Sequence, residues 1–190
     1  MDFFFRIATV FLFALWQFYW LVTAKKADRE KPKTIRITKS KVIIKYGLHY
    51  IVYAGLLVQL LDVQLLPFTY DSQRIGFFLV LLGMAISMSA RKTLGTNWEH
   101  AAEYQIKQKQ VLITQGIYAY IRNPIYTGLA IALIGAELVA RSYLFLFVAL
   151  FGFLVAYRQA KLEEKILEKH FGKQYTEYKK RTKMLIPFVV

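Results

Sequence analysis

Long apolar blocks separated by strongly basic connectors constrain this chain more than any other feature of its sequence. Residues 3–23 form an apolar run broken by Arg6 and Gln17, and about twenty such residues are what a helix needs to cross a bilayer. Further apolar blocks follow at residues 46–66, 75–90, 125–140 and 143–157. Because backbone polar groups find no water inside a bilayer, blocks of this length predict α-helices. The sequence therefore predicts an all-α polytopic membrane protein with about five transmembrane helices.

Composition narrows the class of protein further. Apolar residues make up 56% of the chain, which also carries a net charge of +14 and fifteen Phe. A nucleic-acid-binding protein can have a similar net positive charge, but it does not need long apolar stretches. We therefore assign the charge to membrane topology and expect no nucleic-acid partner. The lack of Cys excludes a disulfide framework, and the three widely spaced His predict no metal site.

The basic residues are concentrated in three connectors, at residues 24–45, 91–122 and 158–183. Because cytosolic loops are enriched in Lys and Arg, this bias predicts an N-terminus outside and a C-terminus in the cytosol. A three-span protein whose last hairpin only dips into the bilayer would have the same sidedness. The short spans and the lack of a eukaryotic sorting signal indicate an integral protein of a prokaryotic cell membrane.

The first apolar block could also be read as a signal peptide, with a cleavage site at residues 22–24. Its length exceeds that of a signal core, and the positive charge follows the block instead of preceding it, so we predict a retained anchor. We divide the chain into residues 1–92, with three helices and a basic connector, and residues 93–190, with the last two helices and a C-terminal amphipathic helix. Residues 93–122 should be loop with one short ordered piece, and Gly172 should interrupt the amphipathic helix.

A stripe of small residues in the third apolar block predicts close packing against another helix. Its members are Gly83, Ala85, Ser87, Ser89 and Ala90.

Residues 111–128, with the sequence VLITQGIYAYIRNPIYTG, mark the change from a polar segment to an apolar helix. Asn123 is a favoured N-cap, and Pro124 suits the first helical turn because its missing N–H costs nothing there. The N–H groups that follow could receive a carboxylate or another anion. The ordinary alternative is that Asn-Pro only begins a helix.

Glu163 and Glu164 form an acidic pair directly after the last apolar block. A tight hairpin of the last two helices would place this pair opposite the helix start at Pro124. There the carboxylates could hold an ammonium group. The alternative is a solvated helix face whose carboxylates pair with the surrounding Lys and Arg.

The C-terminal half resembles the integral-membrane methyltransferases that include isoprenylcysteine carboxyl methyltransferase and the phospholipid methyltransferases. The resemblance begins with Leu94-Gly95 and Trp98 and covers about residues 91–190. Its motifs are Leu112-Ile113-Thr114-Gln115-Gly116-Ile117-Tyr118, Arg122-Asn123-Pro124-Ile125-Tyr126-Thr127-Gly128, Glu163-Glu164, Phe171-Gly172, Tyr175, Tyr178 and Pro187.

The resemblance implies methyl transfer from S-adenosyl-L-methionine in a cytosolic pocket formed by the loop before the fourth helix and the helix after the fifth. It implies that Glu163 holds the ammonium of the cofactor and that residues 110–113 line the adenosine side. The cofactor-binding residues carried over are Gln110, Val111, Leu112, Ile113, Tyr118, Asn123, Pro124, Ile125, Tyr126, Glu163 and Glu164. Methyl transfer is an in-line displacement, so positioning and desolvation should supply most of the catalysis.

Departures from the family pattern bear on the acceptor. Gln110 and Asn123 stand where the family usually has His. Gln159 stands where members acting on a carboxylate usually have Arg, and Arg158 lies one residue earlier, about 100° round a helix. We assign Arg122, Arg158 and Gln159 to the catalytic set and leave open whether Arg158 or Gln159 orients the acceptor.

The expected partners are membrane lipids and a lipophilic or small-molecule acceptor whose carboxylate, amine, thiol or hydroxyl takes the methyl group. No oligomeric state is predicted. Two alternatives from other classes are an NADPH-dependent membrane reductase related to the sterol reductases, and a non-catalytic membrane subunit or small transporter.

Overall fold

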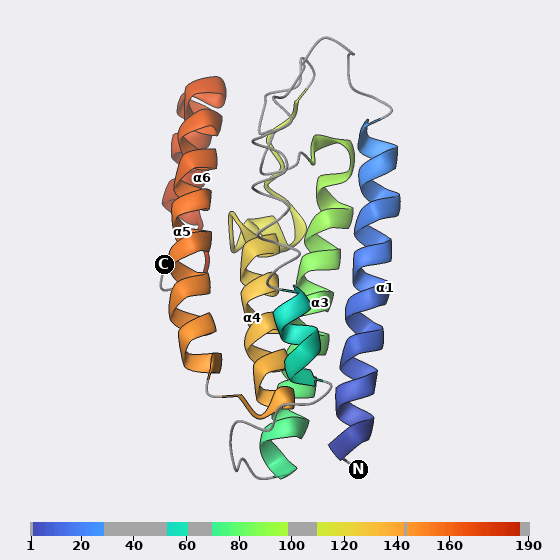
Figure 1. The fold of residues 1–190 in the computed structure, drawn as a ribbon. Helices are drawn as coiled ribbons and strands as arrows, with labels where there is room; N and C mark the ends of the chain where they lie inside the picture. The colour runs from blue at the N-terminus through green and yellow to red at the C-terminus, as the bar shows by residue number, and fades with distance from the viewer. Residues whose placement is uncertain (1, 29–52, 61–69, 99–109, 143, 187–190) are drawn as a thin grey trace. The chain divides into compact units, whose positions relative to one another are not determined.

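The computed structural model describes residues 2–28, 53–60, 70–98, 110–142 and 144–186, which are helical apart from turns, loops and one isolated β-bridge (Figure 1). The long helices are α1 (Asp2–Asp28), α3 (Tyr70–Leu94), α4 (Pro124–Ala140) and α5 (Leu144–Phe171). The shorter ones are α6 (Lys173–Arg181) and the 3₁₀ turns η1 (Gly95–Asn97) and η2 (Gly116–Ala119). The predicted all-α fold is confirmed for these residues.

Two helices in the described part of the chain are long and apolar enough to cross a membrane, over Phe3–Thr23 and Asp71–Leu94. The apolar helix α4 is shorter, at 17 residues. Of the block predicted at residues 46–66, only residues 53–60 are described, and they are helical. The remaining spans and the membrane sidedness stay predictions.

Two helix boundaries differ from the sequence prediction. The third helix was expected at residues 75–90 but begins at Tyr70, so Asp71 lies in its first turn and not in a loop. An acidic residue there, with Arg91 and Lys92 in the last turn, complements the helix dipole. Helix α5 runs from its apolar half into its charged half without a break, and Gly152 in the apolar half does not interrupt it.

Gly172 ends α5, as predicted. It adopts φ 51°, a left-handed conformation that glycine takes at little steric cost, and α6 begins at the next residue.

The chain forms two compact units from interleaved segments. The first comprises Met1–Leu81 and Leu133–Leu146, and the second comprises Leu82–Ala132 and Phe147–Val190. All the contacts around the start of α4 that are described below lie within the second unit. The proposed division at residue 92 stays a prediction.

In the first unit, the C-terminal end of α4 is capped by side chains from two other helices. Gln73 of α3 donates from Nε2 to the carbonyl of Val139 (3.1 Å), and Arg6 of α1 donates to the carbonyl of Ala140 (3.3 Å). Carbonyls in the last turn of a helix have no partner within it, so these donors satisfy groups that a buried helix end must pair. The buried Arg6 interrupts the first apolar block for this reason.

Helices α3 and α4 approach closely in the second unit because small residues line their contact. A Cβ atom added to Gly83 would meet the carbonyl of Gly128 and would lie 2.5 Å from the backbone nitrogen of Ala132. Ser87 donates from Oγ to the carbonyl of Ile125 (3.3 Å). The predicted stripe is therefore confirmed for Gly83, Ser87 and Ala90, which are buried.

The other two members of the stripe, Ala85 and Ser89, are exposed. They lie one or two residues from the buried positions, and such spacings place side chains on different faces of a helix.

We expect Gly83→Ala to destabilise the protein by about 1–3 kcal/mol, because the new methyl group would force the two backbones apart. The matched control is Gly152→Ala in α5, where an added Cβ meets no atom within 4 Å. That change should leave stability unchanged or raise it by up to about 1 kcal/mol. Thermal unfolding in detergent measures both, and equal melting temperatures for the two variants would contradict the close approach.

Candidate active site

The start of α4 is held by the residues that follow α6, which we call the C-terminal segment (residues 182–185). The backbone N–H of Arg122 donates to the carbonyl of Lys183 (2.8 Å), and that of Asn123 donates to the carbonyl of Met184 (3.0 Å). In return, the N–H of Lys183 donates to the carbonyl of Tyr120 (3.2 Å). The two N–H groups just before Pro124 are thus satisfied by the chain itself.

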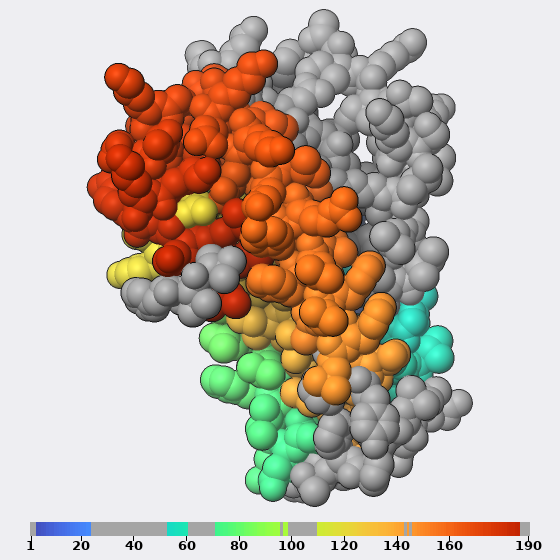
Figure 2. Space-filling model, turned by 90° about the vertical axis from the view of Figure 1, so that its left-hand side faces the viewer, coloured from blue at the N-terminus to red at the C-terminus, as the bar shows by residue number. Residues whose placement is uncertain are grey.

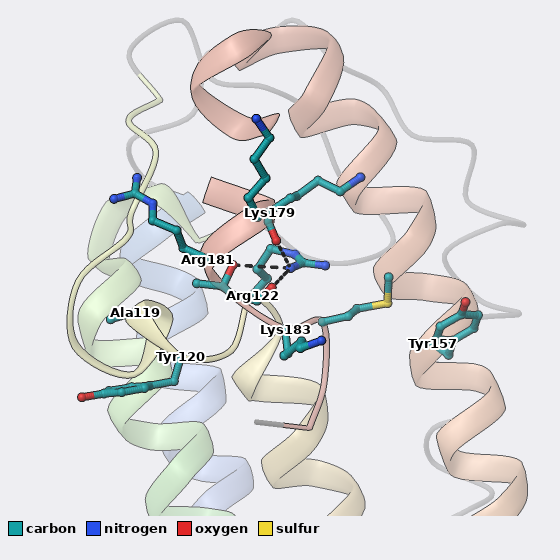
Figure 3. A pocket seen from close by; sticks show the side chains of 10 residues that line it. Ala119, Tyr120, Arg122, Tyr157, Lys179, Arg181 and Lys183 are labelled. Atoms are coloured by element: carbon teal, nitrogen blue, oxygen red, sulfur yellow. Dashed lines mark hydrogen bonds between the residues drawn. The ribbon is translucent and has the colours of Figure 1, made fainter. Parts of the chain in front are cut away.

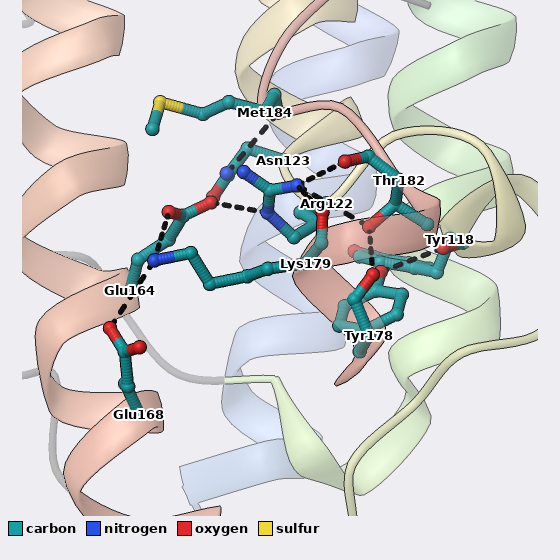
Figure 4. Close-up of polar contacts among 9 residues, drawn as sticks. All are labelled: Tyr118, Arg122, Asn123, Glu164, Glu168, Tyr178, Lys179, Thr182 and Met184. Atoms are coloured by element: carbon teal, nitrogen blue, oxygen red, sulfur yellow. Dashed lines mark hydrogen bonds and ion pairs between the residues drawn. The ribbon is translucent and has the colours of Figure 1, made fainter. Parts of the chain in front are cut away.

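Side chains reinforce this contact (Figure 4). The amide of Asn123 donates from Nδ2 to the carbonyl of Met184 (3.3 Å), and Thr127 donates from Oγ1 to the carbonyl of Leu185 (2.6 Å). Met184 and Leu185 are buried together with Ala160 of α5. The C-terminal segment therefore lies between the start of α4 and the middle of α5.

Arg122 is the centre of a buried polar cluster (Figures 3 and 4). Its Nε lies 2.6 Å from Oε1 of Glu164, and the two side chains are only 8% and 6% exposed. The guanidinium also donates to the carbonyls of Thr182 and Lys179, the latter at 3.4 Å. Arg122 thus joins the start of α4 to α5 and to the residues that follow α6.

The two tyrosines of α6, which belong to the C-terminal motif, help to hold the segment that precedes α4. Tyr175 and Tyr178 are spaced three residues apart, and both are buried. Tyr178 donates from its hydroxyl to the carbonyl of Tyr118 in η2 (2.7 Å). Burial raises the pKa of Tyr178 well above its usual range, so the phenol stays protonated and remains a donor at neutral pH.

Glu163 faces a different set of partners from Glu164, because adjacent helical residues point about 100° apart. One carboxylate oxygen of Glu163 accepts hydrogen bonds from the hydroxyl of Tyr126 and from Nε2 of Gln159 (2.9 Å). The side chain is half-buried. The predicted proximity of the acidic pair to the Asn-Pro helix start is therefore confirmed, because Glu164 forms an ion pair with Arg122 and Glu163 accepts from Tyr126.

The predicted adenosine-side segment, residues 110–113, has no regular secondary structure and is held by η1. The N–H of Val111 donates to Oδ1 of Asn97 (2.9 Å). Val111 is exposed, while Gln110, Leu112 and Ile113 are half-buried. This contact was not predicted from the sequence, and it joins residues 14 positions apart in the chain.

The turn that carries Asn97 is itself braced. Arg91 lies over the ring of Trp98, 4.2 Å from its centroid, and donates to the carbonyl of Gly95 (2.9 Å). Both Arg91 and Trp98 are buried. The Leu94-Gly95 and Trp98 pattern therefore supports the segment that precedes the helix start.

The remaining predicted residues are placed as follows. Tyr118 and Pro124 are buried, and the carbonyl of Ile125 accepts from Ser87. Arg158 is exposed on α5. Pro187 lies outside the described residues.

A pocket of about 400 Å³ opens beside the Arg122 cluster (Figure 3). Its lining residues are Ala119, Tyr120, Arg122, Tyr157, Lys179, Lys180, Arg181, Thr182, Lys183 and Met184. In the space-filling view, yellow atoms of the segment before α4 are visible among the red atoms of the C-terminal region (Figure 2). Arg122 is the one predicted site residue in this lining, so the sequence did not identify this pocket.

Comparison with known proteins gives concordant matches. The phospholipid methyltransferase family model matches residues 72–174, more than half of the chain. The protein-S-isoprenylcysteine O-methyltransferases of Tribolium castaneum and Saccharomyces cerevisiae are 29% and 30% identical to it, each over 116 residues and 60% of the chain. The matches cover 41% and 48% of those proteins, so the chain spans less than half of their length.

A solved structure shares the fold. The structure of a eukaryotic intramembrane Ras methyltransferase, an isoprenylcysteine carboxyl methyltransferase, matches with a TM-score of 0.70 and 20% sequence identity. The match covers 96% of this chain and 66% of that one.

Proposed function

We propose, because this chain belongs to the phospholipid methyltransferase family, that it transfers a methyl group from S-adenosyl-L-methionine to an acceptor at a membrane surface. The family match confirms the resemblance drawn from the motifs. The observation that carries the proposal to particular residues is the carboxylate of Glu163, held beside the first turn of α4 by Tyr126 and Gln159.

A membrane location is supported by the two long apolar helices and by the surface of the first. Helix α1 exposes large apolar side chains that water would not favour but lipid tails would accept. They include Phe3, Phe4, Phe11, Leu15 and Phe18. We propose an integral membrane protein with its active site on the cytosolic side.

The residues around Glu163 fit the chemistry of the cofactor. Tyr126 and Gln159 donate to one oxygen of the Glu163 carboxylate and fix its position, and an ammonium group is the ligand that a positioned carboxylate favours. Tyr126 lies in the first turn of α4, and Asn123 directly precedes that helix. We assign residues 111–113 to a partly apolar wall for the adenosine.

When bound, S-adenosyl-L-methionine supplies an electrophilic methyl group, and the chain needs only to orient it, exclude water and bring the acceptor into line. Glu163 would fix one end of the cofactor, and Asn97 would fix the position of the 110–113 wall through Val111. Both fixed points belong to the same compact unit.

We assign Arg122 and Glu164 a positioning role. Both are buried, they bond to each other, and Arg122 also bonds to two carbonyls. Side chains with such a complete set of protein partners have little capacity left for a substrate. Their contribution to the reaction is to hold the start of α4 against α5, with Glu163 on the neighbouring face.

The acceptor is oriented by Arg158 in this proposal. Gln159 is engaged with Glu163, whereas Arg158 is exposed and has no ion-pair partner among the described residues. An exposed cation near the point where α5 leaves its apolar half suits an acceptor that carries negative charge.

Thermal unfolding of the detergent-solubilised chain tests the proposal. S-adenosylhomocysteine at about a hundred times its Kd should stabilise the folded state by about 2.7 kcal/mol, and so raise Tm by about 5–10 °C. NADPH and adenosine are the control ligands and should have no comparable effect. Stabilisation by NADPH alone would favour a reductase, and stabilisation by none of the three would contradict a cofactor site.

A further inference from the structure

The pocket beside Arg122 is unusual in its charge. Half of its ten lining residues are cationic, namely Arg122, Lys179, Lys180, Arg181 and Lys183. Among the described residues, no Asp or Glu lines it. A concave surface lined by one sign of charge concentrates ligands of the opposite sign.

Three of these cations are already paired with carboxylates outside the pocket. Arg122 pairs with Glu164 (2.6 Å), Lys179 with Glu168 (3.2 Å) and Lys180 with Glu177 (2.7 Å). The other two, Arg181 and Lys183, are exposed and have no ion-pair partner among the described residues. Arg181 also lies near enough to Glu177 to interact with its carboxylate, so the pocket keeps about one to two positive charges, which a phosphate group would neutralise.

The other walls indicate where this pocket lies along α5. Tyr157 is the last residue of the apolar half of α5, and Arg158 begins the charged half. Tyrosine is enriched at the membrane–water boundary, and Tyr120, which is 62% exposed, adds a second such ring. If α5 crosses the bilayer as the sequence predicts, the pocket opens at the level of the lipid headgroups.

We propose that this pocket binds a phosphate group, supplied by the headgroup of an anionic phospholipid in the surrounding membrane. It is separate from the proposed cofactor site, because neither Glu163 nor Tyr126 nor Gln159 lines it. Phosphate bound here would contact Arg181 and Lys183 next to the C-terminal segment, which holds the start of α4. A bound anionic lipid would therefore stabilise the segment that positions the active site.

The test uses the full chain in neutral detergent at physiological salt, where unspecific attraction is screened. Bound phosphatidylglycerol and phosphatidylcholine are compared by native mass spectrometry, and Tm is measured with each lipid and with inorganic phosphate. The pocket variant is the double substitution Arg181→Gln, Lys183→Gln. The control removes the same charge elsewhere, with Lys92→Gln and Lys173→Gln, two exposed residues that do not line the pocket.

We expect phosphatidylglycerol to be retained and to raise Tm in the wild type, and its affinity to fall about tenfold or more in the pocket variant but by less than about twofold in the control. A rise in Tm with inorganic phosphate that disappears only in the pocket variant supports the phosphate site but assigns a water-soluble ligand. Equal binding of the two lipids with no response to phosphate, or equal losses in both double variants, would overturn the proposal. The response to S-adenosylhomocysteine is recorded in the same samples, so failure of the lipid site and failure of the methyltransferase proposal are separately visible.

Discussion

Replacing Glu163 with alanine is expected to abolish measurable binding of S-adenosylhomocysteine by a chain that remains folded. The carboxylate is half-buried and is held by Tyr126 and Gln159, so it is already positioned for a cationic group. Loss of a charge-assisted contact in such a setting costs about 2–4 kcal/mol, which corresponds to a Kd about thirty- to a thousandfold higher. Isothermal titration calorimetry in detergent measures the change.

The matched control is Glu168→Ala, one and a half turns further along α5. Glu168 is 42% exposed and pairs with Lys179, so its removal subtracts the same charge without touching the start of α4. It should leave cofactor affinity within about threefold of the wild type. An unchanged Kd in Glu163→Ala, with the helix content of the wild type, would remove Glu163 from the cofactor site.

Tyr126→Phe tests whether the position of the Glu163 carboxylate affects cofactor affinity apart from its charge. The substitution keeps the ring and removes only the hydroxyl that donates to the carboxylate. A smaller loss of affinity than in Glu163→Ala is expected, because the carboxylate is still present and Gln159 still orients it. Equal losses would indicate that the position of the carboxylate matters as much as its charge.

Local chemistry made part of this site predictable. Pro124 begins α4 because proline has a fixed φ and no N–H. Gly172 ends α5 because glycine adopts a left-handed φ at little cost. The small residues Gly83 and Ser87 likewise signal a close helix contact from sequence alone. Such features depend on a few neighbouring residues and need no knowledge of distant ones.

Contacts between distant segments were not predictable in the same way. Nothing in the sequence around Arg122 indicates that its guanidinium bonds to Glu164, 42 residues later, and to a carbonyl 60 residues later. The sequence also gives no sign that Val111 bonds to Asn97, because an asparagine in a turn usually bonds within that turn. The early start of α3 was missed because its first turn is polar while the apolar period begins only at Ile75.

The different roles that we propose for Glu163 and Glu164 follow from these long-range contacts. The sequence presents an acidic pair, but α5 turns the two carboxylates about 100° apart and gives them unlike surroundings. Glu164 faces a buried guanidinium, whereas Glu163 accepts hydrogen bonds from a phenol and an amide. We therefore assign Glu164 to holding the start of α4 against α5, and Glu163 to contact with the cationic group of the cofactor.

Arg122→Ala is expected to be the most destabilising single substitution that we propose. It leaves Glu164, which is only 6% exposed, with the more distant ammonium of Lys179 at 4.0 Å, and breaking a buried ion pair in this way costs about 3–5 kcal/mol. It also removes the donor to the carbonyls of Thr182 and Lys179, so the C-terminal segment should detach more readily from the start of α4. Thermal unfolding should show a large loss of Tm, and limited proteolysis should cut near residue 182 faster than in the wild type.

The exposed pair Lys180–Glu177 is the control for this substitution. Lys180 lowers the pKa of Glu177, yet both side chains are more than 60% exposed, so water replaces their contact at little cost and Lys180→Ala should leave Tm nearly unchanged. A second comparison is the double substitution Arg122→Met, Glu164→Met, which removes both charges. It should be less destabilising than Arg122→Ala, because no uncompensated carboxylate stays buried. If the Arg122→Ala variant instead unfolds at the wild-type temperature, Arg122 does not hold the C-terminal segment in place. Its guanidinium would then be available to contact the substrate directly.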